Sequence, residues 1–191
     1  VLPFTVAGSG QANIMIVKSW GAGNPEFKYI VFRGEMQILE YSSTGNSTIV
    51  GQANADGAMA VGAVLYTNTP AYGVNPPTPA SFSSIGGAPV VGVTRMKPDF
   101  MAPNGINTTV SLGGQNIDSD VFPNFFGTSA SAPHAAAMAA LVKDARNKFY
   151  SMSMGPEEMR NLMRSTAIDM GAPGFDFTNG YGFVQTDKAL E

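Results

Sequence analysis

Long apolar runs alternate with polar, glycine-rich stretches from about residue 45 onwards. Residues 58–66 (AMAVGAVLY) form a nearly continuous apolar run, as expected of a parallel strand that is covered on both faces by helices. Residues 97–103 (KPDFMAP) predict a second short buried strand that ends at proline. A long helical pattern then extends from Ser129 to about Phe149. These elements predict a central sheet with a helix packed against it.

Two more helices are predicted towards the C-terminus. Pro156 at a first helical position, followed by Glu157 and Glu158, is typical of a helix start. This helix should end at about Ala167, and residues 186–190 could form a last helical turn. The stretch 67–89 is rich in Pro, Gly, Ser and Asn and should be loop. In the long helix, Pro133 is expected in the first turn, where a missing N–H costs little.

Residues 1–46 have a different pattern, which predicts β structure. The segments 13–20 (NIMIVKSW) and 28–32 (KYIVF) are rich in β-branched and aromatic residues. Glycines and Asn24 supply a turn between them, and 37–41 (QILEY) predicts a third strand. Because two or three strands alone are marginally stable in water, this segment should belong to a larger sheet.

Composition limits the classes of function. With 191 residues, 44% of them hydrophobic, the chain fits one globular domain. The net charge is −3 and the 11 basic residues are scattered, so nucleic acid is not expected as a partner. The longest strongly apolar stretch, 135–142, is far shorter than the roughly 20 residues of a membrane span. No secretion signal opens the chain, and we expect the natural protein to start upstream. The absence of cysteine excludes disulfides and thiol nucleophiles.

The segment 127–134 (GTSASAPH) carries the strongest chemical signal. It places a small hydroxyl residue, Ser129, where a loop enters the long helix. The N–H groups of a first helical turn have no internal acceptor, so they could stabilise an oxyanion that forms beside this hydroxyl. On spacing alone, an N-cap serine that satisfies the helix start is the simpler interpretation.

The segment 127–134 resembles the nucleophile motif of the subtilisin family, Gly-Thr-Ser-Met-Ala-x-Pro-His, with Ala130 and Ser131 at its Met and Ala positions. Four further segments occur in the order that subtilases show, namely 47–64, 81–86, 97–103 and 180–182. The resemblance implies an α/β fold, namely the C-terminal half of a three-layer subtilisin-like domain with a mostly parallel sheet. It assigns 47–191 to that catalytic domain. We interpret 1–46 as the tail of an inserted β module.

The resemblance also implies a function. The natural protein should be a serine endopeptidase that forms an acyl-enzyme on Ser129. The family's Asp-Thr/Ser-Gly and His-Gly-Thr segments do not occur in this sequence, so a missing N-terminal part of the same protein should supply the catalytic Asp and His, and this chain alone should be nearly inactive. The alternative is a catalytically inactive, subtilase-like binding module.

The only histidine, His134, is not the expected base. Five residues along a helix rotate its ring by roughly 140° and move it by roughly 7.5 Å from Ser129. In subtilases the histidine at this position is structural, and a packed, hydrogen-bonded helix histidine is the interpretation we adopt.

Substrate-binding residues follow from the resemblance. Gly127 and Thr128 beside the nucleophile and Gly51 in the segment that lines the primary specificity pocket are expected to contact a polypeptide substrate. A glycine at position 51 leaves room for a large side chain, which predicts a preference for apolar or aromatic residues; a plain loop glycine is the alternative. The family's oxyanion Asn has no clear counterpart, because Asn24 and Asn46 both have the context of turn residues.

The remaining polar and Met residues receive structural interpretations. Asp99 is expected to be a buried, hydrogen-bonded residue. Asp118 and Asp120 could bind a structural calcium ion, although a solvated turn is the plainer interpretation, and no other cofactor is expected. Extracellular or cell-surface location is implied by the family. Five methionines are expected to fill the core, namely Met152, Met154, Met159, Met163 and Met170.

Overall fold

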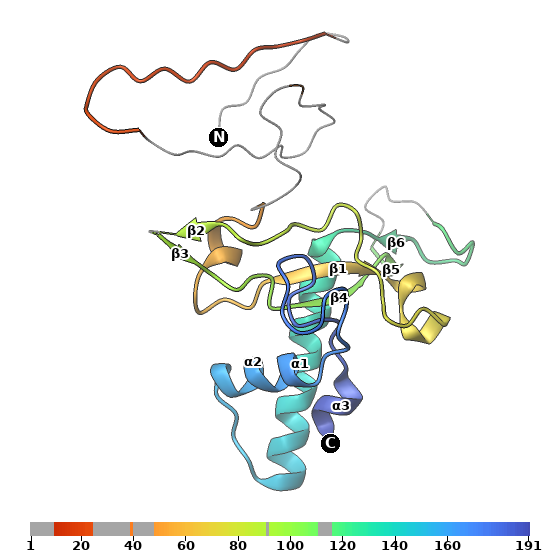
Figure 1. Ribbon diagram of the computed structural model, residues 1–191. Coiled ribbons are helices and arrows are strands. Elements are labelled where there is room, and N and C mark those ends of the chain that lie inside the picture. The colour runs from red at the N-terminus through yellow and green to blue at the C-terminus, as the bar shows by residue number, and fades with distance from the viewer. Residues whose placement is uncertain (1–9, 25–38, 40–47, 91, 111–115) are drawn as a thin grey trace. The chain divides into compact units, whose positions relative to one another are not determined.

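The chain divides into two compact units, Val1–Gln37 and Ile38–Glu191. The structure is a computed structural model that describes residues 10–24, 39, 48–90, 92–110 and 116–191 (Figure 1). The two units are treated separately below.

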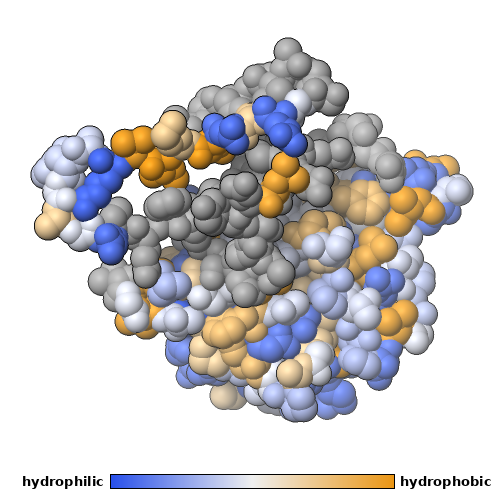
Figure 2. Space-filling model, turned by 45° about the horizontal axis from the view of Figure 1, so that its top comes forward, coloured by the Kyte–Doolittle hydropathy of each residue, from blue (hydrophilic) through white to orange (hydrophobic). Residues whose placement is uncertain are grey.

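In the first unit, residues 10–24 form an extended segment with a bend at its end. The predicted strand 13–20 is therefore wrong. Its apolar side chains stay at the surface (Figure 2), with Ile14 64% and Trp20 88% exposed. A strand needs paired backbone groups and an apolar face to cover, and neither is present in the described part of this unit. The predicted strands 28–32 and, apart from Leu39, 37–41 lie outside the described residues.

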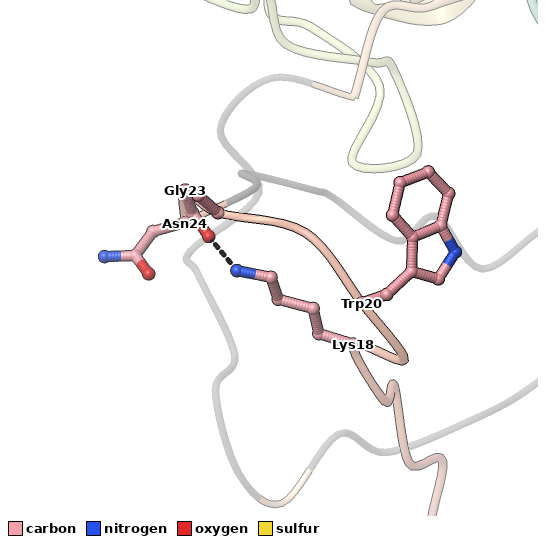
Figure 3. A pocket seen from close by; sticks show the side chains of 5 residues that line it. Lys18, Trp20, Gly23 and Asn24 are labelled. Atoms are coloured by element: carbon pink, nitrogen blue, oxygen red, sulfur yellow. Dashed lines mark hydrogen bonds between the residues drawn. The ribbon is translucent and has the colours of Figure 1, made fainter.

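The bend at residues 20–24 confirms the predicted turn. Gly21 and Gly23 adopt φ values of 95° and 103°, which favour glycine. The Lys18 ammonium donates to the Gly23 carbonyl across the bend, while the Trp20 ring points away from it (Figure 3). This segment is thus held by a local contact.

The second unit contains the predicted parallel strands. Strand β1 (Val61–Leu65) pairs in parallel with β4 (Phe100–Asn104), with Val61 opposite Phe100 and Leu65 opposite Asn104. The three central residues of β1 are buried, as the continuous apolar run predicts. Gly62 is required for packing, because a Cβ there would collide with the Met101 side chain.

Helix α1 (Thr128–Tyr150) packs against β1 and β4, and the shorter helices α2 (Pro156–Ser165) and α3 (Thr186–Leu190) lie beside it (Figure 1). All three helices confirm the sequence predictions. The Gly155 N–H donates to Glu158 Oε2 at 2.8 Å and so satisfies a group at the start of α2. The core between these elements consists of Phe100, Ala102, Ala135, Val142, Met159, Met163, Val184 and Ala189.

The methionine prediction is mostly confirmed. Met159, Met163 and Met170 are buried, and Met154 packs against the core. Met152 is 50% exposed, so its assignment to the core is wrong. It follows the left-handed residue Ser151, which ends α1 and turns the chain away from the core face of the helix.

Short elements occupy the connections. The antiparallel pairs are β2 (Pro89–Val90) with β3 (Val93–Thr94), and β5 (Ile106–Asn107) with β6 (Asn124–Phe125). The predicted loop 67–89 contains the short 3-10 turns η2 (Tyr66–Asn68) and η3 (Pro70–Tyr72), and a further turn, η1 (Gly51–Asn54), precedes β1.

A buried ion cluster around Asp99 ties the sheet to α2. Asp99 is fully buried, and its Oδ2 accepts hydrogen bonds from the Ala60 N–H at 2.7 Å and from Lys97 Nζ at 2.9 Å. Its Oδ1 accepts from Arg164 and lies 3.7 Å from Arg160 Nε. The predicted structural role of Asp99 is confirmed, because one carboxylate joins the residues before β1 and β4 to two cations of α2.

Replacing Asp99 is expected to destabilise this unit strongly. Asp99→Asn keeps the volume but leaves Lys97, Arg160 and Arg164 without their shared buried counter-charge, so the free energy of unfolding should fall by about 3–5 kcal/mol. Denaturant titration of the natural protein measures this. The control Asp144→Asn removes an exposed carboxylate of α1 and should change stability by less than about 0.5 kcal/mol. If the two substitutions lowered the free energy of unfolding equally, the Asp99 cluster would not have the stabilising role given to it here.

Candidate active site

Ser129 lies at an exposed position near the start of helix α1. The hairpin of β5 and β6 ends at Phe125, Gly127 follows as the N-cap of α1, and Ser129 is the second helical residue. Ser129 is exposed, whereas the next residues, Ala130 and Ser131, are 1% and 0% exposed. Ser129 is thus at the surface, while the two residues that follow it are packed in the interior and fix the position of the backbone.

Both peptide groups of Gly127 are hydrogen-bonded. Its N–H donates to Asn104 Oδ1 at 3.4 Å, and its carbonyl accepts from the N–H groups of Ala130 at 2.9 Å and Ser131 at 3.3 Å. The backbone angles of Gly127, φ 112° and ψ 167°, lie in a region that other residues rarely adopt. The turn that carries Ser129 therefore has a defined shape and requires glycine.

Pro133 lies inside α1 and not in its first turn, because the helix begins at Thr128. Proline has no N–H, so it cannot donate to the carbonyl of Ser129 four residues earlier. The N–H of Ser129 itself belongs to the first turn of α1 and therefore has no acceptor within the helix. The start of α1 can therefore offer this N–H to an oxyanion.

His134 has the structural role that we predict from the sequence. Its Nδ1 lies 2.9 Å from the carbonyl oxygen of Ala130, one turn earlier in α1. Since a carbonyl can only accept, Nδ1 carries the proton of this hydrogen bond. The ring is thereby held along the helix, and the sequence contains no second histidine to act as base for Ser129.

An apolar hollow of about 180 Å³ lies next to the nucleophile turn. Its lining comes from β5, β6 and the first turns of α1, namely Ile106, Phe125, Ala130, Pro133, His134 and Ala137. The hollow adds apolar surface beside Ser129.

The other predicted site residues lie on two elements. Gly127 and Thr128 adjoin Ser129 directly. Gly51 lies at the start of η1, is exposed and has φ 60°, with open space where a Cβ would point. Gly127, Thr128 and Ser129 are consecutive residues, and the pocket role of Gly51 stays a prediction. Asn24 is exposed and follows the bend of the first unit, and Asn46 lies outside the described residues.

Asp118 and Asp120 belong to the loop that precedes β6. Asp118 Oδ2 accepts from Tyr66 Oη at 3.0 Å and Asn124 Nδ2 at 3.3 Å. Desolvation raises the pKa of the Asp118 carboxyl, but these hydrogen bonds together outweigh it and hold the pKa below its usual value. Desolvation and the hydrogen bond to Asp118 raise the pKa of Tyr66.

The arrangement of these two carboxylates does not favour a cation. Asp120 accepts hydrogen bonds from the Phe122 N–H and Asn107. In the described ranges, no third carboxylate or histidine joins the pair to make a ligand set. A calcium ion takes six to eight oxygen ligands, which can include backbone carbonyls, and calcium binding by this pair stays a prediction.

Asn104 is the site residue that the sequence interpretation missed. It ends β4 and is fully buried, yet its side chain contacts the turn before Ser129. The available signal was a polar amide directly after the buried run 100–103, because functional side chains gather at the carboxyl ends of parallel strands.

Comparison with known proteins identifies the family. The model of the subtilase family, peptidase S8, matches residues 5–182. The chain is 31% identical over 157 residues to a thermostable alkaline protease of Halalkalibacterium halodurans, covering 78% of this chain and 40% of that protein. It is 28% identical over 176 residues to the subtilisin-like protease SBT2.1 of Arabidopsis thaliana, covering 81% of this chain and 21% of that protein. The chain thus spans less than half the length of these relatives.

A solved structure shows the same fold. The CspB protease of Clostridium perfringens aligns with a TM-score of 0.54 and 23% identity over 76% of this chain and 28% of that chain. The parallel pair β1–β4 with its packed helices is the α/β arrangement predicted from the sequence. The motif around Ser129, the fold and the family match agree, and the chain belongs to the subtilase family of serine proteases.

Proposed function

We propose that the natural protein hydrolyses peptide bonds through an acyl-enzyme on Ser129. The observation that carries this proposal is the position of Ser129 in a chain of the subtilase family. Ser129 is exposed in the first turn of α1, two residues after a glycine that is hydrogen-bonded on both sides.

The chemistry follows from this position. Ser129 Oγ attacks the carbonyl carbon of the scissile bond, and a histidine removes the hydroxyl proton. The electron pair of the carbonyl moves to its oxygen, and the N–H of Ser129 stabilises the resulting oxyanion. When the C–N bond breaks, the histidine gives its proton to the leaving amine. Water then hydrolyses the ester of Ser129 by the same steps.

The base and its partner come from elsewhere in the natural protein. The only histidine of this sequence, His134, lies five residues beyond Ser129 on α1, roughly 140° away around the helix, so we propose that the catalytic His, and the Asp that orients it, belong to a part of the protein outside these residues. This chain alone should then have little activity.

Substrate contacts and location complete the proposal. Gly127, Thr128 and Gly51 contact a polypeptide substrate, and the protein works outside the cell. A relative from Bacillus subtilis, 31% identical over 111 residues, is named a minor extracellular protease. Of the helices that the structure describes, none has both the length and the apolar character to cross a membrane.

The second candidate is an inactive subtilase-like binding module. The observation that favours it is the pair Ala130 and Ser131, which departs from the Met and Ala of the family motif. It predicts peptide binding without cleavage.

The first prediction from this proposal concerns the nucleophile. In the protein expressed from its complete natural coding frame, a fluorophosphonate probe should attach to Ser129, and Ser129→Ala should abolish labelling and reduce turnover by about 10⁶-fold, a magnitude that comes from subtilisin itself. Peptide mapping by mass spectrometry and the hydrolysis of a peptide amide measure the two effects.

Ser131→Ala is the matched control, since this serine lies two residues further on and is fully buried. It should keep both labelling and turnover. Wild-type protein that folds but is neither labelled nor active would refute the protease proposal and favour the binding module.

The second prediction concerns specificity. Because a glycine at position 51 leaves open space where a side chain would point, peptides with Phe or Leu before the scissile bond should have kcat/KM values at least about 10-fold above those of the Ala peptide. A panel of otherwise identical peptides measures this. A strong preference for Arg would refute the role of Gly51.

A further inference from the structure

We propose that Asn104 is a positioning residue for the nucleophile, acting through Gly127. This inference rests on the proposed function of Ser129. Asn104 contacts neither the hydroxyl nor the expected substrate position; its side chain instead accepts a hydrogen bond from the glycine that shapes the nucleophile turn.

The residue pair Asn104 and Gly105 braces this turn at two points. The N–H of Gly105 donates to the Phe125 carbonyl at 2.9 Å, and Asn104 Oδ1 accepts from the Gly127 N–H at 3.4 Å. Gly105 also permits the close approach of Phe126, since a Cβ there would lie 3.0 Å from the ring. The chain from Phe125 to Gly127 is thus fixed by the end of β4.

The hydrogen bond of Asn104 controls a peptide group that determines the direction of Ser129. With the Gly127 carbonyl bound to the N–H groups of Ala130 and Ser131, the helix start is fixed on one side of Gly127. Asn104 fixes the other side. Without it, the peptide between Phe126 and Gly127 could rotate, and the entry of the chain into α1 would change.

Asn104 is well placed for this task because it is itself rigid. It is paired opposite Leu65 at the end of the two parallel strands and is fully buried. It therefore ties the nucleophile turn to the sheet, independently of the loop 116–123.

The amide nitrogen of Asn104 indicates that this side chain does more than fill space in the core. Asn104 Nδ2 is buried and has no hydrogen-bond partner among the described residues. A buried, unpaired donor is unfavourable, and Leu would fill a similar volume without it. The oxygen end is the part of this side chain with a partner, and that partner is Gly127.

The test compares two buried asparagines in the protein expressed from its complete natural coding frame. Asn104→Leu removes the acceptor. Asn179→Leu is the matched control, because Asn179 is also buried with one unpartnered amide atom, but its hydrogen bonds go to Met170 and Asp176. Asn104→Asp keeps an oxygen at the acceptor position and serves as the rescue.

Each variant is checked for folding by circular dichroism and thermal melting. Hydrolysis of a peptide amide then gives kcat and KM, and the fluorophosphonate gives the rate of reaction with Ser129. Asn104→Leu should lower kcat and the labelling rate about 10- to 100-fold with KM nearly unchanged, because misplacing a reacting group costs rate more than binding. Asn179→Leu should leave both rates within about twofold, and Asn104→Asp should restore them to within about threefold.

Different failures have different meanings. If the wild-type protein is labelled but Asn104→Leu reacts as fast, or if both Leu variants lose activity equally, the inference about Asn104 is overturned while the proposed function stands. Loss expressed in KM alone, or no rescue by Asp, also overturns it. If the folded wild-type protein is not labelled at Ser129, the proposed function fails and the positioning role fails with it. Should Asn104→Leu not fold, Asn104→Ala makes the same comparison.

Discussion

The parallel pairing of β1 with β4 under α1 is the constraint on which the second unit depends. Two strands alone would be marginal in water, and this pair is stabilised because α1 covers it and the Asp99 cluster joins its beginning to α2. The ion pairs of Asp99 therefore stabilise the beginning of the pair, and apolar packing against α1 stabilises its middle. Its end, at Asn104, holds the turn of Gly127. The same two strands thus carry the stabilising Asp99 cluster at one end and the residue next to the proposed nucleophile turn at the other.

Helix α1 packs through a few buried residues and leaves Ser129 exposed near its start. Ala135 and Val142 are buried against the sheet, so the helix cannot shift without disturbing the core, and Ser129 is held at its surface end. His134 follows Ser129 by five residues on α1, and the rotation of roughly 140° and rise of roughly 7.5 Å keep its ring away from the Ser129 hydroxyl. The proposed mechanism therefore divides its groups: this part of the domain supplies the nucleophile and an oxyanion donor, and another part supplies the base. The match of this chain to 40% of a protease of the same family agrees with that division.

The sequence predicted those elements whose type can be recognised from the pattern of apolar residues within a single segment. The apolar run 58–66 and the long pattern after Ser129 became β1 and α1, because continuous burial and helical periodicity are visible in one segment at a time. The segment 13–20 has strand-forming residues but no strand, since pairing depends on a partner that local sequence does not specify. Asn104 was missed for a related reason: the sequence shows a polar residue at the end of a strand, but its hydrogen-bond partner Gly127 lies 23 positions later in the chain, and no local pattern identifies that partner.

The two departures from the family motif bear on packing and not on chemistry. Ala130 and Ser131 are 1% and 0% exposed, so they face the core, whereas Ser129 is exposed. A Met-to-Ala and an Ala-to-Ser difference at such positions changes the volume and polarity beneath the helix start. The Ser131 hydroxyl is buried with no partner among the described residues, which costs stability, but it leaves the N–H groups at the helix start unchanged. These differences therefore give the inactive reading little support, and the choice between protease and binding module depends on the groups that would have to meet Ser129 from outside this chain.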